Sequence, residues 1–212
     1  LSRSVKVSVD CTIERSWRQT ACKKTILFTM HRRESFGISL QGMLNALKSF
    51  AVNHPDVQIL YPYHPNPNVL TAIENACLKD CKNIVLIPPI AYQDLVYALL
   101  HISFVVTDSG GIQEEAVSLG KRVIVLREKS ERMEGVWHGL AVLMGYDTQR
   151  FAAFLEKELD HDATSEEHRM ILNNVYGDGF AAEKIVRILE MYALNQDFPA
   201  TRIAEVKYEA FK

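Results

Sequence analysis

Residues 107–115 read Thr-Asp-Ser-Gly-Gly-Ile-Gln-Glu-Glu, which combines the side chains and the spacing of an anion-binding turn. An apolar run, residues 102–106, precedes them and predicts a buried strand, and a helical pattern follows. Two glycines at such a junction let the backbone approach a ligand closely, and the helix N-terminus offers unpaired N–H groups and a positive dipole end. We therefore predict a phosphate or diphosphate site at Ser109, Gly110 and Gly111, with a tightly packed turn as the alternative interpretation.

Two carboxylates, Glu114 and Glu115, follow one turn into the same helix. A diphosphate alone would not recruit negative charge, whereas a carboxylate suits sugar hydroxyls, as in dinucleotide sites. The pattern therefore predicts a nucleotide that carries a sugar.

Composition narrows the classes of protein that this chain can be. Its 212 residues are enough for one large domain or a domain with appendages. The apolar content of 48% is ordinary for a soluble globular protein, and the net charge of −2 argues against a nucleic-acid partner. The sequence contains no run of about 18 apolar residues, so it predicts no membrane-spanning helix. The chain begins with Leu1 instead of Met, so we expect a fragment, a processed chain or a trimmed one.

The four cysteines show no metal-binding pattern. Cys11, Cys22, Cys77 and Cys81 match none of the zinc spacings, although Cys77 and Cys81 would face the same way on a helix. We expect no metal, no cofactor and reduced thiols. Reduced thiols and a missing signal-peptide core indicate a cytoplasmic protein.

Hydrophobic periodicity alternates between strands and helices along most of the chain. Predicted strands are residues 25–30, 57–61, 84–87, 104–106, 123–126 and 141–144, and predicted helices are residues 36–53, 68–78, 92–100, 111–119, 151–159 and 181–192. This alternation predicts an α/β fold of the Rossmann-like type, with a doubly wound parallel sheet covered on both faces.

The ends of the chain do not follow this alternation. Residues 5–13 alternate polar and apolar side chains, which predicts a half-buried strand outside the main sheet, with a disordered leader as the alternative. We divide the chain into an N-terminal extension containing this strand (1–23), the Rossmann-like domain (24–195) and a C-terminal tail (196–212).

Polar residues gather in loops that follow predicted strands, where doubly wound sheets bind ligands. His31, Arg32 and Arg33 follow the first strand of the domain, and arginines offer a fork for phosphate oxygens. Arg127 and Arg132 follow the strand at 123–126 and are candidates for diphosphate or sugar contacts. For both loops, a solvated charged loop is the alternative interpretation.

The motifs resemble one known family in order and spacing. They are HRRESFG at 31–37, HPNPNV at 64–69, TDSGGIQEEA at 107–116, SLGK at 118–121, SERME at 130–134 and YGDG at 176–179. From Lys24 to about Leu194 the chain is similar to the C-terminal domain of the non-hydrolysing UDP-N-acetylglucosamine 2-epimerases. The resemblance implies the C-terminal half of a GT-B fold, in which the active site lies between two Rossmann-like halves.

The resemblance also implies roles for particular residues. The catalytic contribution expected here is that of His31, which matches a histidine that contacts the nucleotide diphosphate. The other matches are Ser109, Gly110 and Gly111 for the diphosphate turn, Glu115 for the ribose, Arg132 for the diphosphate, and Arg32 and His64 for a second, allosteric UDP-N-acetylglucosamine site.

The chain also departs from the family pattern. Val117 and Met133 stand where the family usually has proline, and Ile90 and Leu95 replace residues that contact the uracil region in some members. The family's N-terminal domain carries a Gly-Thr-Arg-Pro-Glu motif and the catalytic carboxylates, and nothing in this sequence matches them.

These matches imply the UDP-holding half of an epimerase that converts UDP-N-acetylglucosamine to UDP-N-acetylmannosamine by elimination and re-addition of UDP. We expect this half to be inactive alone, to require an N-terminal catalytic domain or partner, and to form a homodimer. The alternatives are a non-catalytic UDP-sugar-binding or vestigial module, and the nucleotide domain of a GT-B glycosyltransferase.

Overall fold

A computed structural model of the chain describes residues 24–160 and 175–193. The strand predicted at 5–13 and the segments assigned to 1–23 and 196–212 lie outside the described residues, so these assignments stay predictions.

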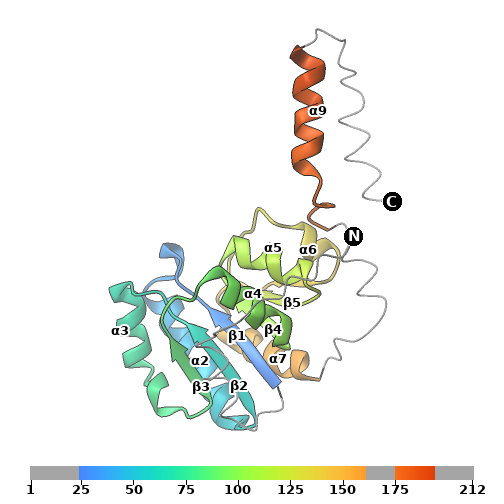
Figure 1. The fold of residues 1–212 in the computed structure, drawn as a ribbon. Coiled ribbons are helices and arrows are strands. Elements are labelled where there is room, and N and C mark those ends of the chain that lie inside the picture. Colours follow the sequence, from blue (N-terminus) through green and yellow to red (C-terminus); the bar gives the residue numbers. More distant parts are fainter. Residues whose placement is uncertain (1–23, 161–174, 194–212) are drawn as a thin grey trace.

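The described residues form one six-stranded sheet in the order β3-β2-β1-β4-β5-β6, and every neighbouring pair is parallel (Figure 1). The strands are β1 (Lys24–Thr29), β2 (Val57–Pro62), β3 (Ile84–Ile87), β4 (Phe104–Thr107), β5 (Arg122–Val125) and β6 (Ala141–Leu143). The order reverses between β1 and β4, which makes this pair the switch point of a doubly wound sheet. The predicted fold class is confirmed.

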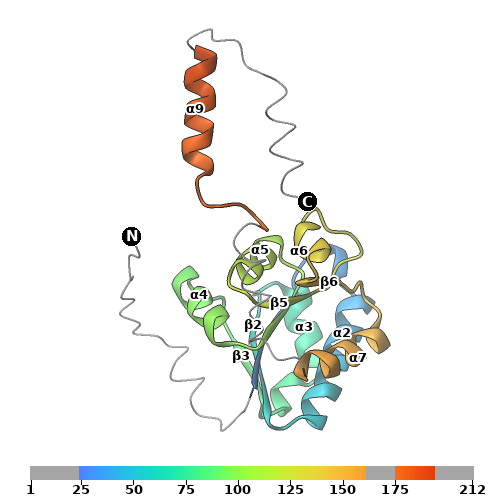
Figure 2. The same ribbon diagram turned by 90° about the vertical axis from the view of Figure 1, so that its right-hand side faces the viewer.

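Helices cover both faces of the sheet (Figure 2). On one face lie α2 (Ile38–Asn53), α3 (Pro67–Asn75) and α7 (Thr148–Leu159); on the other lie α4 (Tyr92–His101) and α5 (Gly110–Ser118), with α6 (Glu134–Trp137) beside α5 and β6. Two short 3-10 helices, η1 (Arg33–Ser35) and η2 (Leu78–Asp80), complete this body. Alternate residues of β1 pack against the helices on opposite faces of the sheet. Phe28 lies in the core with α2, and Leu27 lies in the core with α4 and α5.

The structure differs from the predicted elements at two places. The helix expected at 68–78 ends at Asn75, because Cys77 adopts a left-handed conformation (φ 51°) and η2 follows. Cys77 is therefore exposed and Cys81 buried, and the two do not share a helix face. The short helix α6 had no counterpart in the predictions, since four residues span about one turn and show no periodicity.

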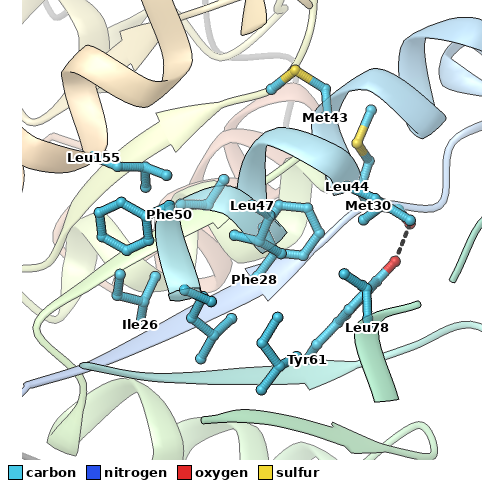
Figure 3. Close-up of a cluster of buried hydrophobic side chains, with 14 of the residues drawn as sticks. Ile26, Phe28, Met30, Met43, Leu44, Leu47, Phe50, Tyr61, Leu78 and Leu155 are labelled. Atoms are coloured by element: carbon cyan, nitrogen blue, oxygen red, sulfur yellow. Dashed lines mark hydrogen bonds between the residues drawn. The ribbon is translucent and has the colours of Figure 1, made fainter. Parts of the chain in front are cut away.

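The larger core supports the chain where it enters the carboxyl edge of the sheet (Figure 3). Phe28 and Tyr61 meet edge to face with ring centroids 4.8 Å apart. The Tyr61 hydroxyl donates to the backbone oxygen of Met30 at 3.3 Å. Met30 directly precedes His31, so packing fixes the point from which the first candidate loop leaves.

The last described helix, α9 (Ala181–Ala193), stands apart from the α/β body in both views (Figures 1 and 2). Asp178 accepts a hydrogen bond from the backbone N–H of Phe180 at 3.1 Å and pairs with Lys184 at 2.6 Å. Asp178 thus stabilises the start of this helix. No helix among the described residues has the length and apolar character needed to cross a membrane.

We expect Phe28→Ala to lower the free energy of unfolding by about 3–5 kcal/mol, because it removes a fully buried ring and leaves a cavity against Tyr61. Urea denaturation followed by circular dichroism measures the change. Ile38→Ala is the matched control, since Ile38 is 93% exposed and its truncation leaves no cavity. Equal losses in the two variants would contradict the described core.

Candidate functional site

The candidate site lies at the carboxyl edge of β1 and β4. The loop after β1 leads to α2 on one face of the sheet, while the loop after β4 leads to α5 on the other face. Neighbouring loops that leave in opposite directions open a crevice between them, and ligands bind at such a point in α/β sheets. His31 and Arg32 belong to the first loop, and residues 109–111 belong to the second.

A buried carboxylate ties these two loops together. Asp108, which is 0% exposed, directly follows β4. Its Oδ2 accepts hydrogen bonds from the backbone N–H groups of His31 and Arg32, both at 2.7 Å. Its Oδ1 has no hydrogen-bond partner and lies 3.5 Å from His31 Nδ1. One side chain therefore fixes the backbone of the neighbouring loop and approaches its imidazole.

Burial and hydrogen bonding act in opposite directions on the pKa of the Asp108 carboxyl. Burial raises the pKa of this carboxyl above its usual range, and the N–H donors and the charges of His31 and Arg32 oppose that shift only in part. Tyr146 is also affected: burial, together with Glu34 and Asp108, raises the pKa of its phenol to about 12.

Two buried threonines join the strand ends beneath the loops. The hydroxyls of Thr29 and Thr107 lie 2.6 Å apart, and Thr107 Oγ1 also accepts from the backbone N–H of Ser109 at 2.9 Å. These contacts hold the β4 turn against β1 and set the direction in which α5 begins.

The turn at residues 109–111 exposes the start of α5 to a ligand. Ser109 is the N-cap residue and makes no side-chain cap bond, so it leaves the first N–H groups of the helix to other partners. A Cβ added at Gly110 would lie 2.7 Å from the guanidinium carbon of Arg132, whereas one added at Gly111 would meet nothing within 4 Å. The absence of a side chain at Gly110 therefore lets the Arg132 guanidinium lie directly over the turn.

Arg132 belongs to a chain of ion pairs that crosses three segments. Its Nε pairs with Glu114 Oε1 at 2.6 Å, and its Nη1 pairs with Glu131. Glu131 also binds Arg127 at 2.9 Å, and Arg127 reaches Glu34 in the loop after β1 at 3.1 Å. A cation thus lies at the start of α5 with carboxylates of the chain as its partners.

Two polar side chains of α5 keep buried atoms without partners. Glu115 Oε2 has no hydrogen-bond partner, and burial, followed by repulsion from Glu114, raises the pKa of Glu115. Gln113 is 1% exposed; its Oε1 accepts from Ser130 at 3.2 Å while its Nε2 has no partner. These atoms are available to a ligand that displaces the surrounding side chains.

A mainly apolar cavity of about 170 Å³ lies beside the β1 loop. Its lining residues are Thr29, His31, Pro62, Tyr63, His64, Pro89, Ile90, Leu95 and Ile112. The rings of His31 and His64 stack there, with centroids 5.5 Å apart and planes 9° from parallel. The His64 loop is rigid in its own right, since His64 Nδ1 accepts from the N–H of Asn66 at 3.2 Å.

The structure divides the residues singled out in the sequence into two groups. His31 and His64 line the cavity. The turn of Ser109, Gly110 and Gly111 lies under Arg132, apart from the cavity lining, and Glu115 follows on α5. Asp108 connects the groups, because it accepts from the backbone N–H groups of His31 and Arg32 and directly precedes Ser109.

Asp108, Glu131 and Gln113 were not singled out from the sequence. Asp108 lies inside the TDSGG motif at a strand end, and that position was a usable signal. The contacts of Glu131 depend on two arginines whose directions follow only from the fold. Among the described residues, no group of three or more His, Cys, Asp or Glu side chains could hold a metal ion.

Comparison with known proteins gives a consistent family. Residues 3–190 match the sequence model of the family described as UDP-N-acetylglucosamine 2-epimerase. A Campylobacter jejuni protein named UDP-N-acetylglucosamine 2-epimerase is 42% identical over 187 residues, which cover 88% of this chain and 48% of that protein.

Solved structures agree with this match. A UDP co-structure of MnaA from S. aureus superposes with a TM-score of 0.76 at 34% identity, covering 91% of this chain and 50% of that one. UDP-GlcNAc 2-epimerase from Neisseria meningitidis bound to UDP-GlcNAc gives 0.70 at 36% identity, covering 78% and 44%. This chain spans about half the length of the curated relatives it matches.

We expect Asp108→Ala to lower the free energy of unfolding by about 1–3 kcal/mol, because two backbone N–H groups lose their acceptor. Amide exchange at His31 and Arg32 should accelerate. Asp108→Asn is the matched control, since its amide oxygen can still accept from both donors. Unchanged exchange in Asp108→Ala would contradict the tie between the loops.

The same pair of variants tests the electrostatics of the site. Because the pKa of Asp108 is raised, the folded state holds its proton more tightly than the unfolded state does. The contribution of Asp108 to stability should therefore fall as pH rises from the ordinary carboxyl range through the raised pKa. Asp108→Asn should lack this dependence, and parallel pH profiles of unfolding free energy would contradict the direction of the shift.

Proposed function

The chain belongs to the UDP-N-acetylglucosamine 2-epimerase family, and from that membership we propose that its α/β domain holds the UDP part of a UDP-N-acetylglucosamine substrate. The observation that supports this most is the position of Arg132 over Gly110, at the start of α5 and at the β1–β4 switch point. A cation over the positive end of a helix is placed to bind an anion from two sides.

In this proposal the diphosphate takes the place of carboxylates that now bind Arg132. Glu114 and Glu131 neutralise the guanidinium in the described structure. A diphosphate over residues 109–111 would accept hydrogen bonds from the helix N–H groups and from Arg132 together. The bonds to the guanidinium are charge-assisted before and after this exchange, so the N–H groups at the start of α5, which bind the diphosphate in addition, favour the exchange.

The cavity beside His31 suits the base of the nucleotide. Its volume of about 170 Å³ is below the roughly 300–1,000 Å³ of pockets that enclose a whole drug-sized ligand. It can therefore take one ring, and Ile90, Leu95 and Ile112 offer apolar contacts for uracil. Glu115 would bind the ribose hydroxyls through its unpaired oxygen.

We assign Arg32 and His64 to a second nucleotide-sugar site that adjoins the first. The stacking of His64 on His31 supports this, because a nucleotide bound at His64 would lie beside one bound at His31. Occupation of the second site would then act on the first through these stacked rings.

The proposed reaction inverts carbon 2 of the sugar. That proton is not next to a carbonyl, so UDP is eliminated across carbons 1 and 2 with loss of the carbon-2 proton, which leaves a glycal. UDP then adds back to carbon 1 while a proton adds to the opposite face of carbon 2. The residues of this chain stabilise the departing diphosphate through Arg132, His31 and the start of α5. An acid/base carboxylate for carbon 2 is a separate requirement, which we assign to the half of the relatives that lies outside the match. The assembled enzyme is proposed to be a cytoplasmic homodimer.

Substitutions at Arg132 and Glu131 should change UDP affinity in opposite directions. Arg132→Ala should weaken UDP binding by about 1.5–3 kcal/mol, the loss of a hydrogen bond to a charged group. Glu131→Gln should strengthen binding, because it removes an anion that competes for the same guanidinium. Isothermal titration calorimetry with UDP measures both.

The matched control is Arg150→Ala. Arg150 is an exposed arginine of α7 that lies over Phe154, away from the site, so its removal should leave UDP affinity unchanged. Equal UDP affinity in the wild-type chain and Arg132→Ala would contradict the proposed diphosphate site.

We expect a chain of these 212 residues to leave the carbon-2 proton of UDP-N-acetylglucosamine in place. The assay is deuterium incorporation from heavy water, followed by NMR, with a full-length relative as the positive control. UDP binding without exchange supports either a nucleotide-holding half or a non-catalytic binding module. Adding the N-terminal half of a relative separates these two, because only a nucleotide-holding half should then support exchange. Exchange at an enzyme-like rate would show that a base exists within this chain.

A further inference from the structure

Asp108 approaches the imidazole of His31 in addition to binding the two backbone N–H groups, and a purely structural tie between the loops does not need this extra contact. The two loop N–H groups bind only Oδ2 of Asp108, which leaves Oδ1 buried, without a hydrogen-bond partner and 3.5 Å from His31 Nδ1. Buried carboxylate oxygens are rarely left unpaired. Catalytic hydrogen bonds are often long in ligand-free structures and shorten when a ligand binds.

We propose that Asp108 is a positioning residue that fixes the tautomer of His31 and couples diphosphate binding to the uptake of a proton. The identity of the ligand in this inference rests on the proposed function, whereas the assignment of the His31 tautomer does not.

The tautomer follows from which groups can donate. An ionised Asp108 only accepts hydrogen bonds, so Nδ1 of the imidazole facing it must carry a proton. Nε2 of the neutral ring then has a lone pair and no proton to donate. A phosphate oxygen is also only an acceptor, so the neutral ring in this tautomer cannot bind it.

Binding of a diphosphate by His31 therefore requires one more proton on the pair. With that proton, one hydrogen lies between Oδ1 and Nδ1 and a second on Nε2 points at the ligand. The pair behaves as one coupled unit, whichever partner holds the shared hydrogen. Uptake of this proton makes UDP affinity fall as pH rises through the titration of the pair.

The other groups around the imidazole do not replace Asp108 in this role. The ring of His64 stacks nearly parallel to that of His31, so its ring nitrogens do not point at Nδ1. Arg32 carries a positive charge, which cannot accept a hydrogen from the ring. Tyr61 is held by Met30 through its hydroxyl, and burial raises its pKa, so it stays neutral.

Asp108→Asn separates the charge of this side chain from its shape. The amide oxygen can still accept from the backbone N–H groups of His31 and Arg32. The amide NH₂ would then face Nδ1 and donate to it, which moves the ring proton to Nε2. His31 in this variant can bind a phosphate oxygen while neutral, without taking up a proton.

Nitrogen-15 NMR of the histidine side chains tests the tautomer without any ligand. The His31 signals are identified by their loss in His31→Gln. We expect the neutral His31 ring to carry its proton on Nδ1 in the wild-type chain and on Nε2 in Asp108→Asn. A wild-type ring with its proton on Nε2, or the same tautomer in both chains, overturns the inference.

Calorimetry tests the coupling to the ligand. UDP is titrated at a pH where the spectra show a neutral His31, in two buffers that differ in ionisation enthalpy. We expect uptake of about one proton by the wild-type chain and close to none by Asp108→Asn. Equal proton uptake in both chains overturns the coupling.

Glu156→Gln is the matched control, because Glu156 binds another histidine, His54, at 2.7 Å near the C-terminal end of α2. This variant should keep the wild-type proton uptake and the wild-type His31 tautomer. Failure of the wild-type chain to bind UDP would overturn the proposed function instead, and the ligand-free spectra would still decide whether Asp108 sets the tautomer.

Discussion

The hydrogen bonds from two backbone N–H groups to the buried Asp108 carboxylate are the contact on which the candidate site depends. The residues that they join lie 77 and 76 positions apart along the chain. A parallel sheet brings the ends of β1 and β4 together, but it then sends their helices to opposite faces. Across the resulting gap, the loops are also connected indirectly, by the partly exposed ion pairs that run from Glu34 to Glu114. Asp108 supplies the direct tie, and the threonine pair below it fixes the strand ends.

The ion pairs around Arg132 follow from the same placement. A guanidinium over the positive end of α5 is unfavourable when no anion is bound, because like charges face each other. Glu114 and Glu131 remove that repulsion in the described structure. Both carboxylates are half exposed, with side-chain exposures of 43% and 56%, so water screens these pairs and their net contribution to stability is small. Weak internal partners keep Arg132 in position while leaving it available to a stronger anion.

Sequence periodicity predicted the sheet well because every strand is short, apolar and followed by a helix. β3 was predicted to the residue, and the other strands to within one or two. The strand–helix junction at the two glycines was also predicted. Neither Gly110 nor Gly111 has a positive φ, and the space above Gly110 is occupied by the guanidinium of Arg132, 22 residues later. The position of Asp108 at a strand end could have marked it as a candidate, but its role could not be predicted from the sequence, since its partners are backbone groups of another loop. Such partners carry no residue-type signal.

The position of Asp108 also limits what this domain can do chemically. A base for carbon 2 of a sugar must reach its substrate, and Asp108 is fully buried, with one oxygen bound to two N–H groups and the other facing His31. Glu114 and Glu131 bind Arg132, so in the proposed complex they lie at the diphosphate, away from the sugar ring. Asp108, Glu114 and Glu131 thus place cations and a histidine around the proposed leaving group. The proposed reaction therefore needs its proton-transfer group from outside these carboxylates, and the match covers only about half of the relatives' length.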